Sequence, residues 1–135
     1  MIEESLALAI ETMVEGIKGT LAAMPGDQGL DEAITNYLSI EYRDNAAGGC
    51  PFVALGGEMA RGGDAVRDVA TRGFLQLVDT VAGQLEGPSA ADARNEALAM
   101  VSTMIGAVTI ARFVSDPELS ESVLRQARKH LTRSS

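Results

Sequence analysis

The segment from Ala97 to Ala111 contains no charged residue, and this constrains the fold more than any other feature. Apolar residues recur in it at three- and four-residue steps, the spacing of one seam of a helix: Leu98, Val101, Ile105 and Val108. Small residues form a second face: Ala99, Ser102, Thr103 and Gly106. A helix that is apolar or small all round must be covered on more than one side. We therefore predict a helix from about Ser89, its N-cap, to Phe113, covered partly by a second copy of the chain.

The remaining sequence is divided by Gly, Pro and capping residues into segments with helical periodicity. We expect helices over about 3–24, 30–42, 51–61, 64–85 and 117–131, with a loop over 44–49. The fold class predicted is all-α: a single helical-bundle domain, residues 1–135, of about six helices. It would dimerise through the last two, residues about 89–131, as an intermolecular four-helix bundle across a two-fold axis.

Several local signals set the expected helix ends. Asp64 is a candidate N-cap. The last helix has two candidate starts, a capping box from Ser115 to Glu118 or Asp116 followed by Pro117. Gly16 and Gly19 lie inside the first helix, where each costs roughly 1 kcal/mol relative to Ala. Either these glycines leave space for a neighbour or a ligand, or they are tolerated defects.

Composition and charge exclude several classes of protein. Apolar residues make up 46% of the 135 residues and aromatic residues only 4%, so the core must be aliphatic and Met-rich. The net charge is −8, and the ten acids and two bases of residues 1–60 account for all of it. Without clustered Lys and Arg, we expect no direct nucleic-acid binding by this chain. The single Cys fits a reducing compartment, the apolar stretches are too short for a membrane span and the N-terminus is acidic, so we expect a cytoplasmic protein.

Residues that might carry chemistry are few. His130, the only histidine, lies in a basic terminal turn with no nucleophile or metal ligands indicated nearby. The glycines from Gly48 to Gly63 match no nucleotide-binding motif. Cys50, at a helix start, is either a thiol of lowered pKa or a buried small apolar residue. No catalytic residue, metal site or cofactor is predicted, and we expect no enzyme activity.

A set of larger apolar side chains has two interpretations. As methionines and aromatics they form either ordinary core or the adaptable lining of an apolar ligand pocket. They are Met13, Met59, Met100, Met104, Phe52, Phe74 and Tyr37. Periodicity favours core. Glu41 and Glu58 are the acids nearest the predicted apolar centre.

Three stretches resemble the C-terminal domain of the tetracycline-repressor (TetR) family of transcriptional regulators. They are Tyr42–Asp44 leading to Gly49–Leu55, Glu58–Arg61 before Asp64–Arg67, and Ala111–Ser120. The resemblance implies a helical effector-binding domain that dimerises through its last two helices. Its ligand would shift a two-state equilibrium in an N-terminal helix-turn-helix domain, which this chain lacks.

The resemblance also implies a ligand cavity lined from the first five helices, for a small, mostly apolar effector. By position, the lining would be Met13, Ile17, Tyr37, Phe52, Leu55, Met59, Phe74, Val78, Met100 and Met104, with Glu41, Glu58 and Thr103 as polar candidates. The alternative is a free-standing helical dimer that acts as a structural module without a ligand.

Overall fold

The computed structural model describes residues 2–45, 49–87 and 89–132, and all regular structure in them is helical. The elements are α1 (Ile2–Ala23), α2 (Asp27–Tyr37), α3 (Ile40–Asp44), α4 (Pro51–Ala54), α5 (Gly56–Arg61), α6 (Asp64–Ala82), α7 (Ala90–Phe113) and α8 (Pro117–Leu131). The predicted all-α class is confirmed. The described residues form eight helices where about six were expected, because two predicted helices are each divided.

The first division separates α2 from α3. The Ser39 hydroxyl donates to the carbonyl of Asn36 (2.7 Å) and accepts from the backbone N–H of Tyr42 (3.1 Å). This side chain therefore replaces helical backbone bonds and starts a new helix, as Ser does at N-caps. The continuous helix predicted over 30–42 was wrong, and so was the one over 51–61, where Leu55 separates α4 from α5.

The predicted caps have mixed outcomes. Ser89 caps α7 by accepting from the N–H of Asp92 (3.1 Å). Asp116 caps α8 by accepting from the N–H of Glu118 (3.0 Å), with Pro117 as the first helical residue. The helix thus uses the second of its two candidate starts. The N-cap of α6 is Gly63 and not Asp64, which is already helical. In the loop predicted over 44–49, residues 46–48 lie outside the described residues.

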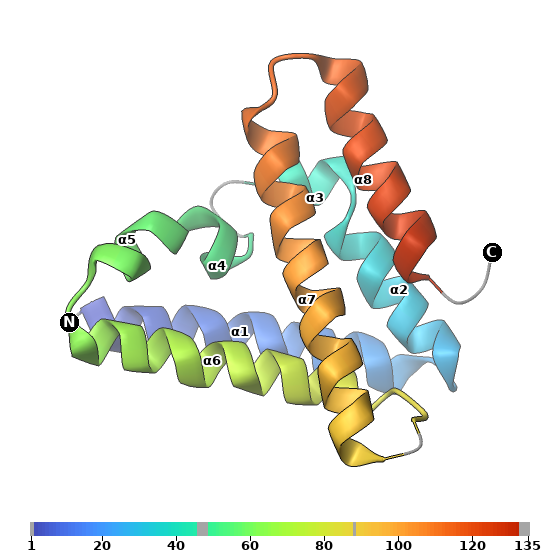
Figure 1. Cartoon of the computed structure of the whole chain (residues 1–135), viewed down its shortest axis with the longest axis horizontal. Coiled ribbons are helices and arrows are strands. Elements are labelled where there is room, and N and C mark those ends of the chain that lie inside the picture. The colour runs from blue at the N-terminus through green and yellow to red at the C-terminus, as the bar shows by residue number, and fades with distance from the viewer. Residues whose placement is uncertain (1, 46–48, 88, 133–135) are drawn as a thin grey trace.

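Helices α1 and α6 lie side by side and run in the same direction, with α7 crossing them and α8 returning along α7 (Figure 1). The close contact of α1 with α6 depends on Gly73, where an added Cβ would lie 2.7 Å from the Ile10 side chain. The turn from α1 to α2 uses Gly26, whose φ of 57° lies in the left-handed region that favours glycine. Gly73 therefore sets how closely α1 and α6 approach, and Gly26 allows the turn that follows α1.

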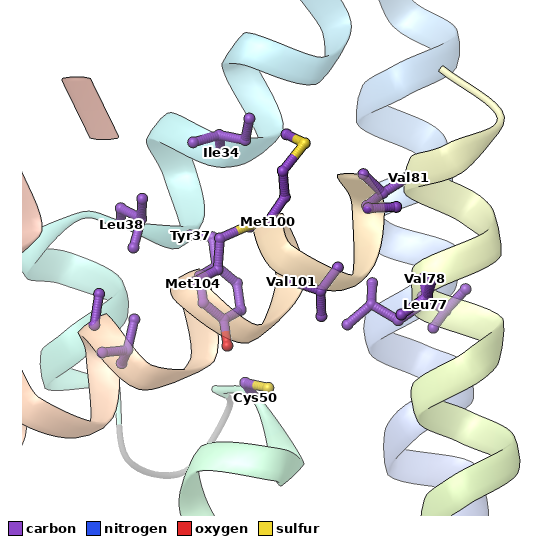
Figure 2. Packing of buried hydrophobic residues seen from close by; sticks show 14 of the residues in the cluster. Ile34, Tyr37, Leu38, Cys50, Leu77, Val78, Val81, Met100, Val101 and Met104 are labelled. Atoms are coloured by element: carbon purple, nitrogen blue, oxygen red, sulfur yellow. The ribbon is translucent and has the colours of Figure 1, made fainter. Parts of the chain in front are cut away.

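The buried face of α7 forms the centre of the core. Val101 and Val108 of the predicted seam are buried, whereas Leu98 and Ile105 are half-buried. Figure 2 shows Met100, Val101 and Met104 between the side chains of α2 and those of α6. By length and composition alone, α7 is also apolar enough to cross a membrane, although 39% of that window is buried inside the fold. The core helix of a globular protein passes the same test.

Three arginines tie the short α3 and the end of α2 to the α7–α8 hairpin. Arg112 donates to the carbonyls of Arg43 (2.9 Å) and Tyr42 (3.4 Å), and Arg128 donates to that of Leu38 (2.9 Å). Arg43 donates to the Ser120 hydroxyl (2.9 Å). The last carbonyls of a helix have no partner within it, so Arg112 and Arg128 act as C-terminal caps contributed from another helix. Arg43 instead bonds a side-chain hydroxyl of α8.

Candidate functional site

A groove of about 600 Å³ lies between α1 and α2, with α3 at one end; we call it the α1–α2 groove. Its lining combines small, hydroxylated, amide and apolar side chains. These residues are Ser5, Leu8, Ala9, Thr12, Met13, Gly16, Ile17, Thr20, Ala33, Asn36, Tyr37, Tyr42 and Gly49. The volume falls within the range of about 300–1,000 Å³ that small-molecule sites occupy.

The sequence of α1 explains the floor of this groove. Small residues recur on α1 at three- and four-residue steps, next to its buried apolar stripe: Ser5, Ala9, Thr12, Gly16 and Thr20. At Gly16 an added Cβ would meet no heavy atom within 4 Å. Gly16 therefore borders open space, and no close contact among the described residues requires a glycine there. Gly19 also faces open space, but it does not line the groove.

Among the residues that the structure describes, no Asp, Glu, Lys, Arg or His side chain belongs to the lining of the groove, although the first sixty residues carry the whole net charge of the chain. Its polar atoms come from hydroxyls, the Asn36 amide and the backbone. The rings of Tyr37 and Tyr42 lie against each other, with centroids 4.7 Å apart and planes tilted by 35°. Burial raises the pKa of Tyr42, so its hydroxyl stays neutral at physiological pH.

Tyr37 is the most unusual residue of the lining. Only 5% of its surface is exposed, and its hydroxyl oxygen is buried without a well-formed hydrogen bond, the only such side-chain atom among the described residues; the Cys50 thiol is its one weak partner. Burial first, and then the neighbouring Cys50 thiol and Tyr42, raise the pKa of Tyr37. Figure 2 shows the hydroxyl pointing toward Cys50 at the start of α4. An unpaired buried hydroxyl is destabilising by about 1–3 kcal/mol.

Cys50 itself is fully buried, and burial raises the pKa of its thiol. The thiolate, which is the reactive form, is therefore disfavoured. Of the two interpretations of Cys50, the buried small apolar side chain fits the structure.

The interior between α1, α2, α6 and α7 is filled. A void of about 20 Å³ lies there, bounded by Ile17 and Tyr37 on one side and by Met104 and Ile105 on the other. Such a volume holds about one water molecule. Between these helices the described residues leave this small void, and the larger open spaces lie in surface grooves.

A second groove, of about 680 Å³, lies on the other side of the first turns of α1, against α5 and α6; we call it the α1–α5 groove. Leu55, Glu58 and Met59 line it together with Ile2 and Val66. The predicted site residues are therefore divided: Met13, Ile17 and Tyr37 lie in the α1–α2 groove, and these three in the α1–α5 groove.

The other predicted site residues lie elsewhere. Phe52 and Phe74 pack edge to face, with ring centroids 6.0 Å apart, and Val78 is fully buried in the core. Met100 and Thr103 line a groove of about 400 Å³ between α7 and α8. Glu41 is exposed on α3, because the break at Ser39 turns that helix away from the axis of α2. The assignment of these residues to a ligand site stays a prediction.

Several lining residues were missed by the sequence analysis, among them Ser5, Thr12, Asn36 and Tyr42. The signal that finds those on α1 is the stripe of small residues, since a helix with larger residues at those positions would fill the groove. No comparable pattern marks Asn36 or Tyr42, because their position depends on the break between α2 and α3.

The outer face of α7 presents uncharged residues to solvent over about four turns: Ala99, Ser102, Thr103, Gly106, Thr109, Ile110 and Phe113. The hydroxyls of Thr103 and Thr109 donate to carbonyls of their own helix (2.8 and 2.7 Å), which leaves their methyl groups outward. Phe113 is 70% exposed, and an added Cβ at Gly106 meets nothing within 4 Å. We call this set the α7 outer face.

A profile of the family described as tetracyclin repressor-like, C-terminal domain, matches residues 26–127. The match covers most of the chain, and the chain therefore belongs to this family, as the resemblance indicated. Domains of this family typically dimerise and bind small ligands in transcriptional regulators, and they are typically not enzymes. A search of curated proteins found no match. Residues 2–23 lie outside the matched range, so α1 and its groove are known from the structure alone.

Proposed function

We propose that the chain is the effector-binding and dimerisation domain of a transcriptional regulator, and that it binds a small, mostly apolar ligand in the α1–α2 groove. The observation that carries this proposal is the groove itself: ligand-sized, free of charged side chains, and lined by Met13, Ile17 and Tyr37. Regulators of this family are soluble cytoplasmic proteins, and we place this chain in the same compartment.

The arginine contacts supply a path from the groove to the α7–α8 hairpin. Tyr42 lines the groove, and its carbonyl accepts from Arg112 of α7. A ligand that displaces the backbone of Tyr42 therefore shifts α3 relative to α7, or breaks this bond. In our proposal, the shift biases a two-state equilibrium that a DNA-binding domain outside this sequence reads.

The α7 outer face is the surface that we assign to dimerisation, together with α8, within residues 89–131. Seven uncharged residues, one of them an exposed Phe, form a contiguous surface. The exposed apolar residues of monomers are more often scattered singly. A two-fold axis places the same face against itself, and small residues allow the two α7 helices to approach closely. Sedimentation at micromolar concentration is expected to show a dimer; a monomer there contradicts this assignment.

Ligand binding is tested by filling the groove. Gly16→Leu places a side chain in the open space over α1, whereas Gly19→Leu, a matched control, places one outside the groove. Both changes improve helix propensity. In a fluorescence titration with Nile red, an uncharged apolar dye, wild type and the Gly19 variant are expected to bind and the Gly16 variant to lose binding. Equal binding by all three contradicts the groove as the site.

The filled interior favours a second candidate, a helical dimer that acts as a structural module without a ligand. The central void holds about one water molecule, so no interior cavity requires a ligand to fill it. This candidate predicts dimerisation with no saturable binding of Nile red or of any uncharged apolar compound.

A further inference from the structure

We infer that the ligand of the α1–α2 groove is uncharged and carries a hydrogen-bond acceptor, which takes the hydrogen of the Tyr37 hydroxyl. This inference rests on the proposed function and specifies the chemistry of the ligand. Two independent observations carry it: the described lining of the groove contains no Asp, Glu, Lys, Arg or His side chain, and the buried Tyr37 hydroxyl has no well-formed hydrogen bond.

The first observation concerns charge. A carboxylate, phosphate or ammonium group that leaves water must gain an opposite charge or several hydrogen bonds in return. None of the described lining residues is Lys, Arg, Asp, Glu or His. The Arg112 guanidinium lies next to Gly49 at one end of the groove, but it already donates to the carbonyls of Arg43 and Tyr42. A charged ligand would leave bulk water for hydroxyls and one amide. An uncharged ligand loses little on transfer and gains apolar contact with Leu8, Met13 and Ile17.

The second observation is the orphan hydroxyl. Buried polar atoms in folded proteins nearly always have a partner, so an exception indicates an unfilled role. Only 5% of the surface of Tyr37 is exposed, and its hydroxyl oxygen has no well-formed hydrogen bond, with the Cys50 thiol as a weak partner. The nearest polar groups include the Cys50 thiol and the Tyr42 hydroxyl, which both raise its pKa. A neutral phenol of raised pKa keeps its hydrogen and so serves as a donor.

The Tyr37 side chain lines the groove, and its hydroxyl points toward Cys50 at the start of α4. Tyr42 and Gly49 line the groove at α3, and Gly49 directly precedes Cys50. Tyr42 is half-buried and lies against the Tyr37 ring. A ligand that enters along α1 and displaces the Tyr42 side chain therefore places its leading atom next to the Tyr37 hydroxyl. The apolar body of the ligand then lies over Gly16 and Met13.

The test compares Tyr37→Phe with wild type in Nile red displacement at neutral pH. Three competitors share a ten-carbon chain: 2-decanone, which is uncharged with one acceptor, decanoate, which is anionic, and decylammonium, which is cationic. Pentylbenzene is the uncharged competitor without a carbonyl acceptor. For wild type we expect 2-decanone to displace the dye at lower concentration than either charged compound.

In Tyr37→Phe we expect the Kd for 2-decanone to rise about tenfold, the loss of one hydrogen bond, and the Kd for pentylbenzene to stay unchanged. The melting temperature without ligand should not fall, because the substitution removes an unpaired buried group. A fall in melting temperature, or an unchanged Kd for 2-decanone, overturns the assignment to Tyr37.

Failure of the inference and failure of the proposed function give different results. If decanoate or decylammonium displaces the dye best, or if Tyr37→Phe binds 2-decanone normally while Gly16→Leu does not bind, the groove is the site but the ligand chemistry is wrong. If no competitor displaces the dye and Gly16→Leu binds it as wild type does, the proposed function fails together with the inference.

Discussion

Two exposed stripes of small residues in this molecule have similar sequences and different surroundings. The stripe on α1 contains Gly16 and the α7 outer face contains Gly106, and at both glycines an added Cβ meets nothing within 4 Å. The α1 stripe is bordered by α2 and α3, which turn it into the floor of a groove. The α7 outer face is bordered mainly by α8, the other helix of its hairpin. In our proposal both stripes are contact surfaces, and the neighbouring helices determine whether the surface contacts a ligand or a second chain.

The strongest test of this comparison places a charge on the α7 outer face. Gly106→Arg is expected to raise the dimer dissociation constant at least about 100-fold, because a two-fold interface brings two buried guanidinium groups together without partners. Sedimentation measures the effect. Gly19→Arg, at an equally open helix glycine of α1, is the control and should leave the dimer intact. Loss of the dimer in both variants would indicate general destabilisation.

Gly73, in contrast, lies in a helix–helix contact with no open space beside it. At Gly73 an added Cβ would lie 2.7 Å from two atoms of Ile10, so Gly73→Ala must push α1 and α6 apart. We expect the free energy of unfolding to fall by about 1–3 kcal/mol, measured by urea denaturation. Gly16→Ala, in contrast, should stabilise by up to about 1 kcal/mol from helix propensity. The same sign for both substitutions would contradict the distinction between open and filled glycines.

The connection between the two stripes is tested at Arg112. Arg112→Ala removes the donor to the carbonyls of Arg43 and Tyr42. The expected loss of stability is about 1–2 kcal/mol, with a weaker response of the α7–α8 hairpin to ligand. Hydrogen exchange of α8 with and without Nile red measures that response. Arg125→Ala, on the exposed surface of the same hairpin, is the control. An unchanged ligand response in Arg112→Ala would remove Arg112 from the path.

The smallest expected effect is the dependence of stability on alkaline pH. Burial raises the pKa of Tyr37, Tyr42 and Cys50 above the ordinary values of the unfolded chain. For acids whose pKa is raised by folding, stability is complete below the unfolded pKa, about 8.5 for Cys and 10 for Tyr, and falls as pH rises beyond it. We expect a loss of roughly 1 kcal/mol at about pH 9.5, measured by urea denaturation.

In Cys50→Ala that loss should move to higher pH, where only the tyrosines contribute. A stability that is flat to pH 10.5 in the wild-type protein would show that these groups are accessible to water in the folded state.

The elements of the fold differ in how well the sequence predicts them. The extents of α7 and α8 follow from long periodic segments with capping residues, Ser89 and Asp116, and both were predicted closely. The α2–α3 break was missed because one side-chain hydroxyl at Ser39 competes with backbone bonds that periodicity favours equally. The groove was missed for the same reason, since Tyr37 and Tyr42 meet only after that break.

The sequence by itself determined the helical class, the central place of α7 and the scarcity of groups for catalysis, because periodicity and composition act locally along the chain. Only the tertiary structure decided that Met13, Ile17 and Tyr37 share a groove while Val78 is core and Thr103 faces outward. Those outcomes depend on the angles at which helices cross, and the angles are set by contacts between distant residues such as Ile10 and Gly73. The unpaired Tyr37 hydroxyl is a consequence of that packing, and periodicity carries no signal for it.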